Sequence, residues 1–185
     1  MEKEIVRQGA LLARKKAHES KGDDIDISLL IDAVFSFSKV EIISGYMPIK
    51  TEISPLEAMK KLAHCGKRLC LPVVQSAGKP LFFKEWTPDS SMVRGVFGAQ
   101  IPENGLVLNP ELLIVPLVAF DRNGARLGYG GGFYDRSLDQ LRRQKRTIAV
   151  GFAYSSQEVE KVPTERTDQQ LDMVVTENEI IHFNN

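Results

Sequence analysis

Residues 112–136 read LLIVPLVAFDRNGARLGYGGGFYDR, and this segment carries the strongest structural signal in the 185-residue chain. Its first nine residues, 112–120, are apolar at nearly every position, which is typical of a strand buried on both faces of a sheet. A polar, glycine-rich loop follows over 121–132, and helical spacing then predicts a helix over 133–143. A buried strand, a loop and a helix in this order predict an α/β domain.

Patterns elsewhere in the chain extend this prediction. Apolar residues at helical spacing predict helices, and short β-rich runs bounded by glycine or proline predict strands. The predicted helices cover residues 1–20, 27–38 and 56–64, and the predicted strands cover residues 40–44, 69–74, 81–86, 92–97 and 147–153. Strands that alternate with helices favour one domain over residues 1–185, a three-layer sandwich whose mostly parallel central sheet has helices on both faces.

The composition argues against several classes of function. Lys and Arg number 24 and Asp and Glu number 24, so the formal net charge is zero, which disfavours binding to nucleic acid or a membrane surface. The longest apolar run has nine residues, whereas a membrane-spanning helix needs about 20. Cys65 and Cys70 have neither zinc-site nor redox-motif spacing, and the N-terminus has no secretory pattern. We expect a cytoplasmic monomer with reduced thiols.

The glycine-rich loop is the best candidate for a functional site. Four glycines lie within residues 128–132, and successive backbone N–H groups in such a loop can converge on an anion. The N-terminus of the following helix adds N–H groups and a positive dipole end. Arg126 can add a positive charge for a phosphate, and the carboxylate of Asp135 can hold Mg²⁺. Neither the Walker A pattern nor G-x-G-x-x-G is present, so a plain glycine-rich turn is an equal alternative from the residues alone.

The same segment resembles the signature of the 5-formyltetrahydrofolate cyclo-ligase family. That signature reads P-x-x-A-F-D-x-x-G-x-R-L-G-x-G-x-G-[YF]-Y-D-R, and every fixed position is present between Pro116 and Arg136. Residues 3–7 resemble the family's K-x-x-x-R, residues 46–53 resemble its Y-x-P-x-x-x-E-[IV], and residues 151–172 resemble its C-terminal pattern. The resemblance therefore covers nearly the whole chain.

The resemblance implies an ATP-dependent ligase that converts 5-formyltetrahydrofolate to 5,10-methenyltetrahydrofolate and releases ADP and phosphate. In such an enzyme the formyl oxygen is phosphorylated, and N10 of the folate then closes the ring. Mg²⁺ is the implied cofactor, and ATP and 5-formyltetrahydrofolate are the implied small-molecule partners. The residues implied are Lys3, Arg7, Arg126, Leu127, Gly128, Tyr129, Gly130, Gly131, Gly132, Phe133 and Tyr134 for ATP, Arg126 and Tyr129 for catalysis, Met47, Glu52 and Tyr129 for the folate, and Asp135 and Asp172 for the metal.

Alternatives stay open beside this interpretation. Lys3 and Arg7 share one helix face, and spacing alone favours a solvated face there. A different ATP-dependent phosphorylating enzyme could keep these residues and the loop. A folate- or nucleotide-binding regulator without turnover is the other alternative, because the chain has Ile101 and Thr167 where family members often have Glu and His.

Overall fold

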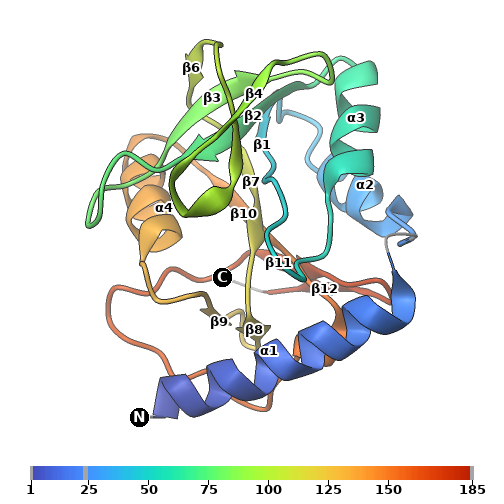
Figure 1. The fold of residues 1–185 in the computed structure, drawn as a ribbon, viewed down its shortest axis with the longest axis vertical. Coiled ribbons are helices and arrows are strands. Elements are labelled where there is room, and N and C mark those ends of the chain that lie inside the picture. Colours follow the sequence, from blue (N-terminus) through green and yellow to red (C-terminus); the bar gives the residue numbers. More distant parts are fainter. Residues whose placement is uncertain (1, 23–24, 184–185) are drawn as a thin grey trace.

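The computed structural model describes residues 2–22 and 25–183. Its main sheet has eight strands in the order β12-β11-β10-β7-β1-β2-β3-β6 (Figure 1). Five neighbouring strands, from β11 to β2 in this order, run parallel, and β12, β3 and β6 pair antiparallel at the two ends. The bounds are β1 (Ile42–Ser44), β2 (Arg68–Val73), β3 (Phe82–Trp86), β6 (Val107–Leu108), β7 (Leu112–Pro116), β10 (Ile148–Phe152), β11 (Met173–Val175) and β12 (Ile180–His182). The predicted mostly parallel sheet is confirmed.

Helices cover both faces of this sheet. α2 (Ser28–Phe35) and α3 (Leu56–His64) pack on one face, and α4 (Phe133–Gln144) packs on the other (Figure 1). Successive residues of β7 contribute to the two cores in turn: Leu112 belongs to the core under α2 and α3, and Leu113 belongs to the core under α4. Two buried faces explain why this strand is apolar at every position. The predicted three-layer α/β architecture is confirmed.

The first helix, α1 (Glu2–Lys21), lies outside the three layers and crosses the end of the sheet where the parallel strands finish (Figure 1). Its residue Ala10 packs into a small core with Val118 and Leu127. Among the helices of the described ranges, none has the length and apolar character needed to cross a membrane.

The apolar run 112–120 forms two elements. β7 ends at Pro116, and β8 (Ala119–Phe120) pairs antiparallel with β9 (Arg126–Leu127) in a separate two-stranded sheet. Proline has no N–H for a sheet ladder, which is consistent with the end of the pairing between β7 and β10 at this residue. The prediction of one strand over 112–120 was therefore too long.

The strand predicted over 92–97 is also shorter than expected. β4 (Met92–Arg94) pairs with β5 (Gln100–Pro102), and a 3₁₀ turn, η1 (Val96–Gly98), connects them. Phe97 has φ of +61° in this turn, a conformation that a strand cannot contain.

The strand order reverses between β1 and β7. From β1 the sheet continues to β2 and β3 in one direction, while β7 lies on the other side of β1 and is followed by β10 and β11. In open α/β sheets, ligands bind beyond the carboxyl ends of the strands at such a reversal. The segment 45–53 follows β1 directly, and the glycine loop 128–132 follows the short strands β8 and β9 that come after β7, so both predicted half-sites leave the sheet at this reversal.

Candidate active site

The glycine loop 128–132 adopts a backbone that needs glycine at particular positions. Gly130 has φ of +96° and Gly132 has φ of +62°, the left-handed region that other residues rarely adopt. A Cβ on Gly131 would lie 2.7 Å from the ring of Phe133, so a side chain there would require this ring to shift. Gly132 directly precedes α4, which places the loop amides beside a helix N-terminus. This combination is suited to binding phosphate groups.

The two cations of α1 that the resemblance implied for ATP, Arg7 and Lys3, have different partners in the structure. The Nε of Arg7 donates a hydrogen bond to the carbonyl of Gly128 at 3.0 Å. The Nζ of Lys3 lies 2.9 Å from Asp168 and 3.1 Å from Glu165. Burial lowers the pKa of Lys3, but its hydrogen bonds to these two carboxylates outweigh that effect and leave the pKa raised. Arg7 is therefore held at the loop, and Lys3 is held at the C-terminal segment.

Arg126 and Asp135 form an ion pair beneath the loop. The Nη2 of Arg126 donates to Oδ1 of Asp135 at 2.7 Å, and its Nη1 donates to the carbonyl of Gln169. Burial lowers the pKa of Arg126, and the charge of Asp135 opposes this effect. Oδ1 of Asp135 also accepts from the backbone N–H of Gln169 at 3.0 Å. These two residues therefore connect the loop to the C-terminal segment.

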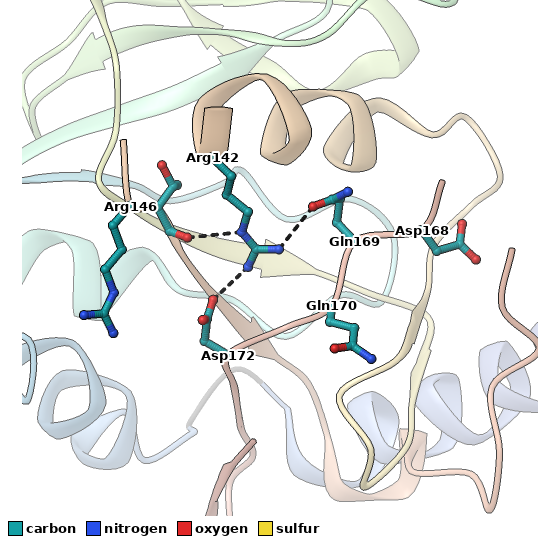
Figure 2. Close-up of a pocket in the computed structure, with 7 residues that line it drawn as sticks. Arg142, Arg146, Asp168, Gln169, Gln170 and Asp172 are labelled. Atoms are coloured by element: carbon teal, nitrogen blue, oxygen red, sulfur yellow. Dashed lines mark hydrogen bonds and ion pairs between the residues drawn. The ribbon is translucent and has the colours of Figure 1, made fainter. Parts of the chain in front are cut away.

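Asp172, the second carboxylate implied for a metal, has other contacts in the structure. Its Oδ2 accepts from Nη2 of Arg142 at 2.8 Å and from the backbone N–H of Ala149 at 2.7 Å. Figure 2 shows this carboxylate pointing at Arg142, at an open depression of about 530 Å³. The contacts join α4, β10 and the C-terminal segment, which is a structural role. The carboxylate close to Lys3 and Arg126 is that of Asp168.

The donor set for a metal ion is small. Within residues 2–22 and 25–183, no group of three or more His, Cys, Asp or Glu side chains is arranged to hold a cation. Mg²⁺ that arrives with a triphosphate needs only one or two protein carboxylates, because phosphates and waters supply its other ligands. Asp135 and Asp168 beside the loop fit that requirement.

The segment 46–53 supplies a buried carboxylate opposite the loop. Glu52 is 6% exposed, and its Oε2 accepts from the backbone N–H of Ile49 at 2.9 Å. Burial raises the pKa of Glu52 above its usual value, although the hydrogen bond from Ile49 opposes this. The hydroxyl of Tyr46 donates to the carbonyl of Ile53 at 2.6 Å and closes the segment on itself. Met47 is half-buried and packs against the core under α2 and α3.

Tyr129 joins the two half-sites through a residue that the sequence analysis did not identify, Arg14 of α1. The Nη2 of Arg14 donates to the hydroxyl of Tyr129 at 2.5 Å, and its guanidinium lies 5.4 Å from the centre of that ring. Lys50 lies the same distance from the ring. Arg14 falls at i+11 from Lys3 and i+7 from Arg7, so helical periodicity could have placed it on their face.

The other predicted loop residues lie mainly beneath the loop. Leu127 is buried in the core with Ala10, so a nucleotide could meet only its backbone. The ring of Phe133 lies 6.0 Å from that of Phe97. Tyr134 packs against the core under α4, and burial raises the pKa of its phenol. Its buried hydroxyl has no hydrogen-bond partner in the part of the chain that the structure describes.

This fold and site define an α/β protein with a glycine loop suited to anionic ligands at the reversal point of its sheet, opposite a buried carboxylate. The sequence profile of the 5-formyltetrahydrofolate cyclo-ligase family matches residues 2–177. The chain belongs to this family.

Individual relatives agree with this assignment. The chain is 42% identical over 135 residues to the 5-formyltetrahydrofolate cyclo-ligase of Haemophilus influenzae. The aligned region covers 70% of this chain and 72% of the relative. It is 37% identical over 145 residues to the Escherichia coli K12 enzyme of the same name, covering 75% and 79% of the two chains. The solution structure of Aquifex aeolicus 5,10-methenyltetrahydrofolate synthetase superposes with a TM-score of 0.80 at 28% identity, covering 100% of this chain and 94% of that one.

Proposed function

We propose that this protein catalyses the ATP-dependent conversion of 5-formyltetrahydrofolate to 5,10-methenyltetrahydrofolate, with release of ADP and phosphate. The observation that carries the proposal is the junction at the β1–β7 reversal, where Tyr129 of the glycine loop and Glu52 meet at Arg14. Membership of the cyclo-ligase family supports it.

The reaction asks the protein for positioning and charge neutralisation. The formyl oxygen attacks the γ-phosphorus, and the bond from that phosphorus to the bridging oxygen of ADP breaks. N10 then adds to the activated formyl carbon and loses its proton. The bond from this carbon to the phosphorylated oxygen breaks last, which releases phosphate and leaves the methenyl bridge. Such steps need aligned substrates and compensated phosphate charge more than a protein nucleophile.

The ATP half-site consists of the glycine loop and the cations around it. The loop amides and the N-terminus of α4 are positioned to bind phosphate oxygens, and Arg7 is held over the loop by Gly128. Lys3 exchanges a carboxylate partner for a phosphate when the nucleotide binds. We assign ATP contact to Lys3, Arg7, Arg126, Leu127, Gly128, Tyr129, Gly130, Gly131, Gly132, Phe133 and Tyr134.

Mg²⁺ would be held by Asp135, with Asp168 as the second carboxylate in place of Asp172. When bound, the ion would neutralise the negative charge that develops on the phosphate groups during transfer. Asp135 retains Oδ2 for this purpose, because its described hydrogen bonds both go to Oδ1. Arg126 keeps this carboxylate in place through its 2.7 Å contact.

The folate half-site lies around Glu52. A carboxylate accepts hydrogen bonds, and the pterin presents two adjacent donors, its 2-amino group and N3–H. Met47 offers a flexible apolar surface for the folate rings. Tyr129 of the glycine loop is 41% exposed and contacts Arg14 beside this half-site, and we assign it contact with both substrates.

The test is product formation by the purified protein. 5-Formyltetrahydrofolate and Mg²⁺ are mixed with enzyme, with and without ATP, and the near-ultraviolet absorbance of the conjugated methenyl product is followed. An ATP-dependent rise with one ADP per product is the expected result. If folate binds in calorimetry without turnover, the protein is a regulator. If only ATP binds, it is a phosphorylating enzyme with another substrate.

A further inference from the structure

Arg14 has a buried side chain, although it lies in the middle of α1, a helix with a largely exposed surface. It is 1% exposed, although arginine is rarely buried without full pairing. Its Nε donates to Oγ1 of Thr51 at 3.1 Å, and its Nη2 donates to Tyr129. Its Nη1 is buried and has no hydrogen-bond partner among residues 2–22 and 25–183. A buried donor without a partner is destabilising, so it calls for an explanation.

The unpaired Nη1 lies next to the carboxylate proposed to bind the pterin. It is 3.9 Å from Oε1 of Glu52, close enough for charge attraction and too far for a hydrogen bond. Next to this pair, the hydroxyl of Tyr129 accepts a hydrogen bond from Nη2 of Arg14 at 2.5 Å. This hydroxyl occupies a hydrogen-bonding position on Arg14 beside Glu52, where a ligand with adjacent donors and an acceptor would bind.

Tyr129 is well placed to leave that position. Tyr129 is 41% exposed, and it lies between Gly128 and Gly130 in the glycine loop. A Cβ on Gly128 would meet no heavy atom within 4 Å, so the backbone there has open space around it.

The pterin edge complements the Glu52–Arg14 pair. The 2-amino group and N3–H are donors and match the carboxylate of Glu52, while the neighbouring C4 carbonyl is an acceptor. We propose that Nη1 of Arg14 donates a hydrogen bond to this C4 carbonyl, so that Arg14 is a specificity-determining residue for 4-oxo pterins. The inference rests on the proposed function, because it requires a reduced folate in this half-site.

The first test changes the ligand and leaves the protein intact. Dissociation constants of the wild-type protein are measured by calorimetry for 5-formyltetrahydrofolate and for its 4-amino-4-deoxy analogue. We expect the 4-oxo compound to bind at least about tenfold more tightly, the effect of a charge-assisted hydrogen bond. Equal binding of the two compounds overturns the inference without any variant. No binding of 5-formyltetrahydrofolate overturns the proposed function instead.

The second test separates Arg14 from Glu52, because a 4-amino group also removes the N3–H that Glu52 would accept. The preference for the 4-oxo ligand is compared in E52Q and in the double variant R14M/E52Q. We expect E52Q to retain about tenfold preference and the double variant to show less than about twofold. An equal preference in both variants means that Arg14 only positions Glu52, and the inference fails. K15M, an exposed neighbour on α1, is the matched control and should keep the wild-type preference.

Discussion

The ion pair between Arg126 and Asp135 gives a prediction that the structure makes quantitative. D135N keeps the shape of the side chain and removes its charge. The Arg126 side chain is 6% exposed, and the Asp135 side chain is 25% exposed. The variant therefore leaves a buried guanidinium without its nearest counter-charge.

The size of the effect follows from the contacts that are lost and kept. Removing one partner of a buried ion pair costs about 3–5 kcal/mol. The partial exposure of Asp135 and the remaining bond from Arg126 to the Gln169 carbonyl reduce this. We expect D135N to lower the free energy of unfolding by about 2 kcal/mol.

The assay is urea unfolding followed by far-ultraviolet circular dichroism, analysed by linear extrapolation. D139N is the matched control, because Asp139 lies on the same helix and its pair with Arg143 is exposed. We expect it to change the free energy by about 0.5 kcal/mol or less. If D135N is as stable as D139N, the pair does not hold the loop to the C-terminal segment. In turnover, D135N should lose at least about a hundredfold and D139N nothing.

Three further variants test the two half-sites. R7Q should raise the KM for ATP and leave that for the folate unchanged, because Arg7 is held over the loop by the carbonyl of Gly128; a raised folate KM would contradict the assignment. G132A should cost about 1–2 kcal/mol in urea unfolding, because Gly132 has φ of +62°, and equal stability would show that the loop backbone tolerates a Cβ. The free energy of unfolding of E52Q should rise relative to that of the wild type as the pH increases above about 4.5. Burial raises the pKa of Glu52 from that value, so the folded wild type holds its proton more tightly and loses stability as the carboxyl ionises. A pH-independent difference in unfolding free energy would contradict this.

Much of the fold could be predicted because its signals are local. The apolar run of β7 predicts a strand buried on both faces, and the helix over 56–64 has the predicted bounds. Pro116 marks the end of β7 in the sequence, but the apolar residues 117–120 after it led to the longer predicted strand. Strands β6, β11 and β12 were not predicted, because runs of two or three residues give too little periodicity and are fixed by pairing with distant strands.

The candidate site was only partly accessible from sequence. The glycine loop is contiguous, so its composition shows it directly. Arg14 was missed because its function as a link depends on Tyr129, which is 115 residues away in sequence and beside it in space. Asp168 and Asp172 are four residues apart, and only the fold shows that Asp168 contacts Lys3 while Asp172 contacts Arg142.

The transfer of the formyl oxygen tests the central mechanism most directly. 5-Formyltetrahydrofolate labelled with ¹⁸O in the formyl group is converted by the enzyme with unlabelled ATP, and the phosphate released is analysed by mass spectrometry. If the glycine loop presents the γ-phosphate to the formyl oxygen, each phosphate carries one ¹⁸O atom. Unlabelled phosphate, with the ¹⁸O in water, would show that ATP is hydrolysed separately and would contradict the proposed reaction.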